Sequence, residues 1–331
     1  MIHCSHRKSL LIRYNGKNQA MQQIRRHCRP VRLTMIVTAA VSALIISGCS
    51  GVQKKLLIND SSLSYPAGII ISGKSGTPVP PEALFADLDK VRIVYVGENH
   101  RNPEHHRIQL RIIREIYKKH PDLIIGMEMF AGTYQPVLDK WSGGMLDEKE
   151  FLKKVHWYVN WRFKYELYRD ILDFARQHQV RIAGLNIPFH IPPKIAVGGI
   201  DSLLDDDRRY LPAEIDTSIK AHRDYIQKIF KFHHLPGRED FENFYMAQCV
   251  WEDKMAESIA LNLDGRPMVV IAGNGHIRNK FGIPDRAYKR TLVPFLTISL
   301  IPAGGSADLS CADYIWVTSQ DSEQHGHRHR F

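Results

Sequence analysis

The stretch VRIVYVGENHRNPEHH, residues 91–106, determines how the rest of the chain is interpreted. It begins with an apolar run typical of a buried strand and turns at Gly97. Asn102 and Pro103 then stand where a helix N-cap and first helical position are favoured. Isoleucines follow at helical spacing, at positions 108, 112, 113 and 116. We therefore predict a strand followed at once by a helix that continues to about residue 119.

Five further apolar runs resemble this strand, and helical patterns lie between them. The predicted strands cover residues 68–72, 91–97, 122–129, 181–187, 267–273 and 293–300. Their near-continuous apolar character is typical of strands covered on both faces. Segments 135–175 and 190–263 have helical patterns, and the first is rich in aromatic residues. The sequence therefore predicts an α/β fold over residues 67–318, with a mainly parallel central sheet flanked by helices and interrupted by helical insertions.

Residues 1–48 are interpreted as a targeting segment. They contain eight Lys or Arg and no Asp or Glu, so without them the net charge falls from +10 to +2. The remaining chain has no basic stripe, and we expect no nucleic-acid partner. Four arginines precede the apolar stretch MIVTAAVSALII, which is shorter than the ~18 residues of a membrane span. We predict a secretory signal peptide that starts at Met21 rather than at Met1.

The signal ends in ISGC, which resembles a bacterial lipoprotein box. The resemblance implies cleavage before Cys49 and attachment of acyl chains such as palmitate to that residue, which suffices for stable anchoring. Because Ser50 follows rather than Asp, it also implies an outer-membrane protein that faces the periplasm. Residues 49–66 would be the linker to the lipid anchor. Cys249 lies among apolar neighbours, and we predict a buried free thiol there.

The tail, residues 319–331, carries His325, His327 and His329 at alternate positions. We predict a disordered terminus, with divalent-metal binding as the alternative.

Polar residues follow three of the predicted strands. They are Glu98 and His100 in GENH, Glu128 in GMEMF, and His276 in GNGH. Because ligands bind where the carboxyl ends of parallel strands meet, we expect these four side chains to surround one site. Two imidazoles and two carboxylates can hold a divalent transition metal, or a carboxylate can act as a general base. The alternative is that each is a hydrogen-bonded structural group.

Two further histidines lie in the first turn of the predicted helix. His105 and His106 are about 100° apart on a helical wheel. We therefore expect at most one of them to face the site and the other to be a solvated surface group.

Several segments resemble a known family in both content and order. They are VGENHRNPEHHRIQL, GMEMFAGTYQPVLDKW, WRFKYELYRDILDFA, GLNIPFHI, LPGREDFENFYMAQCVWEDKMAESIA and VVIAGNGHIR. In these segments the chain resembles ChaN, the iron-regulated haem-binding lipoproteins of the Tiki superfamily. The resemblance implies haem bound through a tyrosine, cofacial haems at a homodimer interface, and an uptake receptor in the outer membrane as a partner. It also implies that Glu98, His100, Glu128 and His276 are the superfamily's Glu and His motifs, which carry metal-dependent hydrolysis in some members.

The tyrosine that ligates iron is not singled out by the sequence. The candidates are Tyr168, Tyr165, Tyr158 and Tyr245. We place Tyr168 first, because Arg169 beside it can meet a haem propionate. His233 and His234 could also bind a propionate or iron, with solvated loop histidines as the alternative.

Trp251, Glu252 and Asp253 are interpreted as packing and surface charge on one helix. A contribution of Asp253 to a site is left open.

The leading prediction is a lipid-anchored protein that captures haem for iron acquisition. The alternatives are a metal-dependent hydrolase that uses the four Glu and His residues, and an envelope scaffold with a degenerate site.

Overall fold

The computed structural model describes residues 54–59, 61–232 and 239–320. The predicted signal peptide, Cys49, His233, His234 and the histidines of the tail lie outside these ranges. Within them, no helix is both long and apolar enough to cross a membrane.

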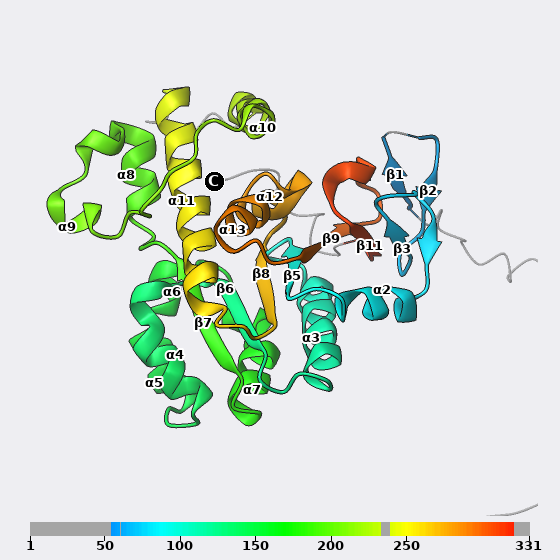
Figure 1. Ribbon diagram of the computed structural model, residues 1–331, viewed down its shortest axis with the longest axis horizontal. Coiled ribbons are helices and arrows are strands. Elements are labelled where there is room, and N and C mark those ends of the chain that lie inside the picture. The colour runs from blue at the N-terminus through cyan, green and yellow to red at the C-terminus, as the bar shows by residue number, and fades with distance from the viewer. Residues whose placement is uncertain (1–53, 60, 233–238, 321–331) are drawn as a thin grey trace, which may run out of the picture. The chain divides into compact units, whose positions relative to one another are not determined.

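The core of the fold is an eight-stranded sheet (Figure 1) with the order β4-β3-β11-β9-β5-β8-β6-β7. Its strands are β3 (Ile70–Ser72), β4 (Pro78–Val79), β5 (Ile93–Glu98), β6 (Ile124–Ala131), β7 (Arg181–Asn186), β8 (Met268–Gly273), β9 (Phe295–Pro302) and β11 (Tyr314–Thr318). All pairs from β11 to β7 are parallel, whereas β3 is antiparallel to both β11 and β4. The predicted mainly parallel sheet is confirmed.

A second, smaller sheet has the order β10-β1-β2. Its strands are β1 (Leu56–Ile58), β2 (Ser64–Tyr65) and β10 (Ser306–Ala307). The first two of these strands fall within the segment predicted as a linker.

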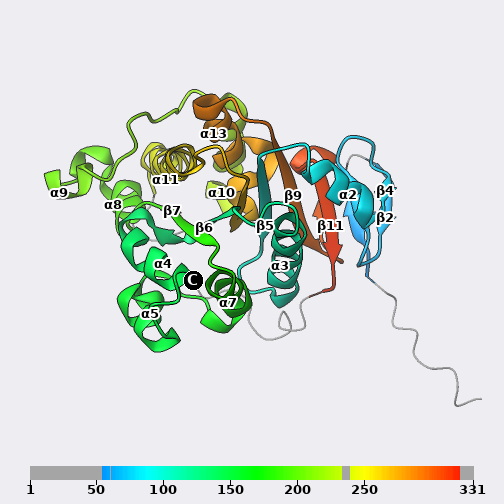
Figure 2. The same cartoon turned by 60° about the horizontal axis from the view of Figure 1, so that its bottom comes forward.

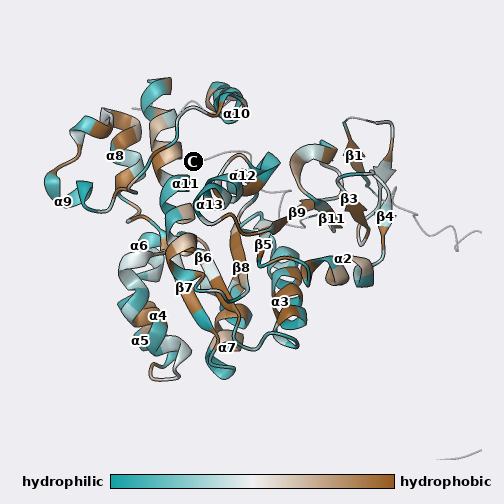
Figure 3. Ribbon diagram, in the orientation of Figure 1, coloured by the Kyte–Doolittle hydropathy of each residue, from teal (hydrophilic) through white to brown (hydrophobic). Residues whose placement is uncertain are grey.

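Helices cover both faces of the central sheet (Figures 1 and 2). They are α2 (Pro81–Leu88), α3 (Pro103–Tyr117), α4 (Gln135–Ser142), α5 (Glu148–Lys154), α6 (Trp157–Asn160), α7 (Arg169–Gln177), α8 (Ile191–Gly198), α9 (Asp205–Arg208), α10 (Lys220–Phe232), α11 (Phe241–Asn262), α12 (Asn274–Ile277) and α13 (Ile283–Thr291). In β5, Val94 and Val96 belong to a core cluster that includes residues of α2, α3 and α7, whereas Ile93 and Tyr95 belong to a cluster that includes residues of α11 and α13. Successive strand residues point to opposite faces, so a strand buried on both sides is apolar throughout. Figure 3 shows the result as brown strands inside the sheet.

Helix α3 begins where the sequence predicts. The side chain of Asn102 accepts hydrogen bonds from the backbone amides of Glu104 (2.9 Å) and His105 (3.4 Å), and Pro103 occupies the first helical position. The cap satisfies amide groups that otherwise lack a partner at a helix start. The isoleucines at helical spacing are buried against the sheet, which fixes the helix at the carboxyl end of β5.

The prediction that one of the two helix histidines is solvated is wrong. Both His105 and His106 are buried. His105 accepts a hydrogen bond at Nδ1 from the amide of Asn99 (2.8 Å), and its Nε2 lies 3.0 Å from Oγ1 of Thr318. Thr318 of β11, far away in the sequence, covers His105, whereas His106 faces Glu98 and the ring of Tyr168.

The interpretation of Cys249 as a buried free thiol is confirmed. Burial raises its pKa to about 12.

Candidate site of Glu and His residues at the sheet edge

The site lies at the carboxyl ends of β5, β8 and β6, which are neighbours in the sheet. Glu98 is the last residue of β5 and is in register with Gly273 at the end of β8. His276 follows three residues later in α12, and Glu128 comes from β6. A Cβ added to Gly273 would lie 3.0 Å from Nε2 of His100 and 3.6 Å from Oε2 of Glu128. The structure thus brings the four sequence-predicted residues together, and glycine at position 273 allows their close approach.

Glu98 is buried and receives donors on both oxygens. Its Oε1 accepts hydrogen bonds from Nδ1 of His100 and from the hydroxyl of Tyr168, each at 2.6 Å. Its Oε2 accepts one from Nε2 of Gln109 (2.7 Å) and lies 3.3 Å from Nδ1 of His106. Burial alone would raise the pKa of Glu98, but the two histidines outweigh it and lower the pKa well below its ordinary value. Glu98 is therefore a carboxylate at neutral pH.

Glu128 and His276 form a second pair. Oε2 of Glu128 accepts a hydrogen bond from the amide of Gly273 (2.7 Å), and Oε1 lies 3.5 Å from Nε2 of His276. Burial disfavours the charged forms of Glu128 and His276, but each charge is stabilised by the opposite charge of its partner. As a result, the pKa of Glu128 is lowered, and that of His276 is raised to about 10.

His100 is the member of the site that reaches solvent, with 24% of its side chain exposed. Its ring packs between Trp161 (4.9 Å between centroids) and Phe163 (4.7 Å). Its Nδ1 is held by Glu98, whereas Nε2 makes no hydrogen bond to any residue in the described ranges. Burial alone would lower the pKa of His100, but Glu98 and Glu128 raise it. An imidazole with one nitrogen fixed by a carboxylate and the other open can donate or accept a proton.

Across residues 54–59, 61–232 and 239–320, no three His, Cys, Asp or Glu side chains are arranged to hold an ion. The site instead consists of two Glu–His pairs.

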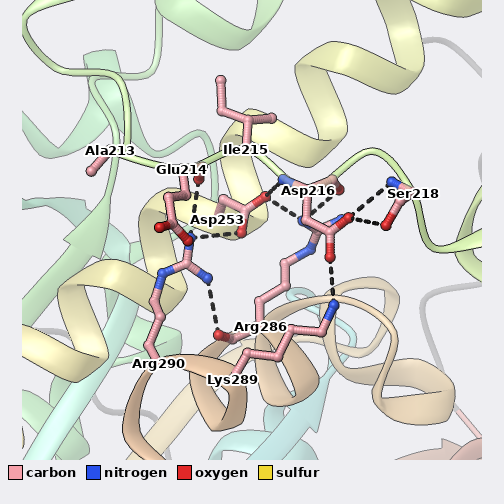
Figure 4. A pocket seen from close by; sticks show the side chains of 9 residues that line it. All are labelled: Ala213, Glu214, Ile215, Asp216, Ser218, Asp253, Arg286, Lys289 and Arg290. Atoms are coloured by element: carbon pink, nitrogen blue, oxygen red, sulfur yellow. Dashed lines mark hydrogen bonds and ion pairs between the residues drawn. The ribbon is translucent and has the colours of Figure 1, made fainter.

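The interpretation of Glu252 and Asp253 as surface charge is wrong, because both are fully buried in α11. Arg286 of α13, also fully buried, lies 3.5 Å from Glu252 through Nε and pairs with Asp253 through Nη1. A cavity of about 610 Å³ lies beside Asp253 and Arg286. Figure 4 shows the residues that line it, among which Arg290 also pairs with Asp253. The signal for burial in the sequence is that this acidic pair stands among apolar residues of the longest helix.

The predicted haem-ligand tyrosines occupy different environments. Tyr165, Tyr168 and Tyr245 are buried, and the hydroxyl of Tyr168 donates to Glu98. Tyr158 on α6 is 62% exposed. Arg169, expected beside a propionate, instead forms an ion pair with Glu148, with Nε 3.1 Å from Oε2.

Fold and site define a parallel α/β protein with a Glu–His site at the carboxyl edge of its sheet. The profile of the family described as haem-binding uptake, Tiki superfamily, ChaN matches residues 84–287. The chain belongs to this family, as its sequence resemblance indicated. No curated protein compared with the chain matches it.

A solved structure shows the same fold. The structure describing cofacial haem binding to ChaN of Campylobacter jejuni is 19% identical, with a TM-score of 0.59, and the match covers 75% of this chain and 95% of that one. Weaker similarities include a mutant of the erythromycin esterase EreC in its open conformation (13% identity, TM-score 0.42, 70% of this chain and 77% of that one). The type III effector HopBA1 is comparable (14% identity, TM-score 0.43, 72% and 92%).

Proposed function

We propose that this protein binds haem on the surface formed by α6 and its flanking residues, 153–164. Family membership supports haem as the ligand. The observation that carries the proposal is the composition of this surface. The segment, KKVHWYVNWRFK, contains no acidic residue. Tyr158 and Val159 are exposed side by side, at 62% and 79%.

The cations of this surface are available to a ligand. Lys153, Lys154, Arg162 and Lys164 are exposed, and none forms an ion pair with another described residue. Haem presents an apolar ring and two propionates, so it matches an apolar platform with cations at its rim. A tyrosine phenolate is an established ligand of haem iron. We assign that role to Tyr158, because its ring is accessible in the free protein.

Contacts with the core beneath it stabilise the surface formed by residues 153–164. Trp157 is buried, its Nε1 donates to the carbonyl of Phe163 (2.9 Å), and its ring packs edge-on against Tyr165 (5.5 Å). Nδ2 of Asn160 donates to the hydroxyl of Tyr134 (2.7 Å). A short helix fixed in this way loses little conformational entropy when it binds a ligand.

Haem on an exposed surface keeps one face uncovered. A second copy of the chain would cover that face, so the proposal includes a homodimer with haem at its interface. The sequence supports a lipid anchor at Cys49 in the outer membrane, facing the periplasm. From there the protein would pass haem to an uptake receptor.

Hemin titration of the full chain tests the proposal. We expect a Soret band that saturates with hemin and at least a tenfold loss of affinity in Tyr158→Phe. Tyr288→Phe is the matched control, because Tyr288 is 43% exposed but lies on α13. The tail histidines are replaced by glutamine in parallel, so that they do not contribute. Unchanged affinity in Tyr158→Phe would contradict the assignment of the ligand, and absence of a Soret shift in the wild type would contradict haem binding.

A second candidate function is hydrolysis at the Glu–His site. It is favoured by His100, whose Nδ1 is held by Glu98 while its Nε2 makes no hydrogen bond within the described ranges. In this proposal Glu98 orients His100, and His100 transfers the proton between water and the leaving group. We expect turnover of members of an ester and amide panel to be lost in His100→Gln. Metal analysis of the tail variant then shows whether a divalent transition metal takes part. No turnover across the panel would count against this function.

A further inference from the structure

Leu57 is a large apolar side chain on the outer face of the small sheet, where it is 49% exposed. In β1, Leu56 and Ile58 are fully buried, and Leu57 between them points to solvent. Its cross-strand neighbours, Ser64 of β2 and Ser306 of β10, are both small. A single exposed leucine is common on protein surfaces, so its surroundings decide whether it has a role.

The outward direction of Leu57 is fixed by the core on the other side of the small sheet. Leu56 and Ile58 belong to a core cluster that also contains Ile71 of β3 and Val317 of β11. Because successive strand residues point to opposite faces, β1 cannot present another face without exposing both buried side chains to water. The loss of that buried apolar surface would be unfavourable. The small sheet therefore presents Leu57 to its surroundings permanently.

Two lysines come directly before β1. Lys54 and Lys55 are exposed, and neither takes part in an ion pair with another residue of the described ranges. The segment QKKLLI, residues 53–58, contains no acidic residue. An apolar side chain with cations beside it matches a bilayer with anionic head groups, because the apolar group enters the interface while the cations attract lipid phosphates.

The position of β1 along the chain favours lipid over a protein as the partner of this face. Lys55 follows Cys49, the residue that we propose to be acylated, by six positions. Six residues span at most about 20 Å even when they are fully extended. Acyl chains attached to Cys49 therefore keep the small sheet within about 20 Å of the lipid head groups. A protein partner of this face would have to enter that narrow gap.

We propose that Lys54, Lys55 and Leu57 form a membrane-docking surface on the outer face of the small sheet. This inference depends on the proposed lipid anchor at Cys49, and it adds a defined orientation of the protein on the bilayer. Leu57 enters the interface between head groups and acyl chains, and the two lysines contact lipid phosphates. Figures 1 and 2 place the small sheet at the end of the described part of the chain that is opposite α5. The proposed haem surface, residues 153–164, then faces away from the bilayer and stays open to haem.

Fluorescence quenching in vesicles tests this surface. The acylated protein carries a fluorophore at Leu57→Cys or, as a matched control, at Leu204→Cys, and the phosphatidylethanolamine–phosphatidylglycerol vesicles carry a nitroxide quencher on an acyl chain. Leu204 is 72% exposed and precedes α9, at the end of the domain opposite the small sheet. Cys249 and Cys311 are buried, so the label goes to the introduced thiol. We expect quenching at position 57 to be about threefold stronger than at position 204, because only position 57 reaches the interface.

The contribution of the lysines is tested by removing their charges. Lys54→Gln combined with Lys55→Gln should reduce quenching at position 57 about twofold, because the attraction to anionic lipid is lost. Lys153→Gln combined with Lys154→Gln is the matched control, since these adjacent lysines are also exposed but lie on α5. This second pair should leave the quenching unchanged. Replacing phosphatidylglycerol by phosphatidylcholine should have the same effect as the first pair.

Equal quenching at positions 57 and 204 in vesicles that hold the protein would overturn the docking surface, and so would an equal effect of the two lysine pairs. The anchor is tested separately, by flotation of the wild type with vesicles and by loss of flotation in Cys49→Ser. A protein that floats without lipid contact at Leu57 would refute this inference alone. A wild type that does not float would refute the anchor, and with it the docking surface.

Discussion

Replacing Tyr168 with phenylalanine separates the structural role of this residue from haem ligation. Its hydroxyl donates to Oε1 of Glu98 at 2.6 Å inside the core. Burial and, next, the charge of Glu98 raise the pKa of Tyr168 well above its ordinary value, so it remains a phenol donor. Phenylalanine keeps the ring contacts with His106 (4.3 Å) and Trp157 (5.6 Å) and removes only this bond.

The expected loss follows from the charge of the acceptor. A hydrogen bond to a charged group contributes about 1.5–3 kcal/mol, and an unsatisfied buried acceptor adds to the loss. Glu98 keeps its bonds from His100 and Gln109 and its contact with His106, so the carboxylate is not left without donors. We therefore expect Tyr168→Phe to lower the free energy of unfolding by about 2 kcal/mol.

Urea unfolding followed by tryptophan fluorescence measures this change, with an unchanged m-value showing that the unfolded state is unaffected. Tyr288→Phe removes a half-exposed hydroxyl and should change stability by no more than about 0.5 kcal/mol. A similarly small change in Tyr168→Phe would refute the reasoning about Glu98. If the folded Tyr168→Phe protein lost hemin binding while Tyr158→Phe kept it, the proposed ligand would be wrong.

Three further predictions test the site and its supports. A Cβ at Gly97 would clash with the side-chain oxygen of Asn274, so Gly97→Ala should lower the free energy of unfolding by about 1–3 kcal/mol in urea unfolding. Gly275→Ala is the control, because a Cβ at Gly275 would have no other atom within 4 Å and would not clash. Arg286→Met removes the buried cation that pairs with both Glu252 and Asp253, leaving Asp253 only its contact with Arg290, and should lower stability by about 3–5 kcal/mol, measured in the same way. The pKa of Glu128 is lower in the folded protein than its ordinary value of 4.5, so ionised Glu128 stabilises the fold at any pH above 4.5. This contribution is lost as the pH falls from 4.5 through the pKa of the folded state. The melting temperature of Glu128→Gln should therefore depend less on pH below 4.5 than that of the wild type.

The sequence predicted the elements whose signals are local. The six predicted strands agree with β3, β5, β6, β7, β8 and β9 to within two residues at every end, and α3 begins at its predicted cap. Apolar runs and cap residues act within a few residues of one another, which is why they can be read from sequence. Strands β1, β2, β4, β10 and β11 were not predicted. Most are two or three residues long, and β1, β10 and β11 each pair with a strand far away in the sequence.

The same distinction applies to the site. The positions of Glu98, Glu128 and His276 follow from strand ends in a parallel sheet, which sequence patterns reveal. The bond from Tyr168 to Glu98 joins residues 70 positions apart and has no local signature. The apolar neighbours of Glu252 indicate that it is buried, but its partners on α10 and α13 follow only from the tertiary structure.

The titratable groups of the opening stretch lie next to the core because they compensate one another there. Glu98 is placed between imidazoles of α3 and the loop after β5, and Glu128 between the amide of Gly273 and His276. Such pairs lower the cost of burial only while both partners keep their geometry, so the site needs the rigid support of the sheet. Trp161 closes this cluster on the side of α6, where it contacts His100. Trp161 therefore belongs both to the haem surface that we propose and to the surroundings of the Glu–His site. The exposed Tyr158 lies outside the group of buried charged side chains.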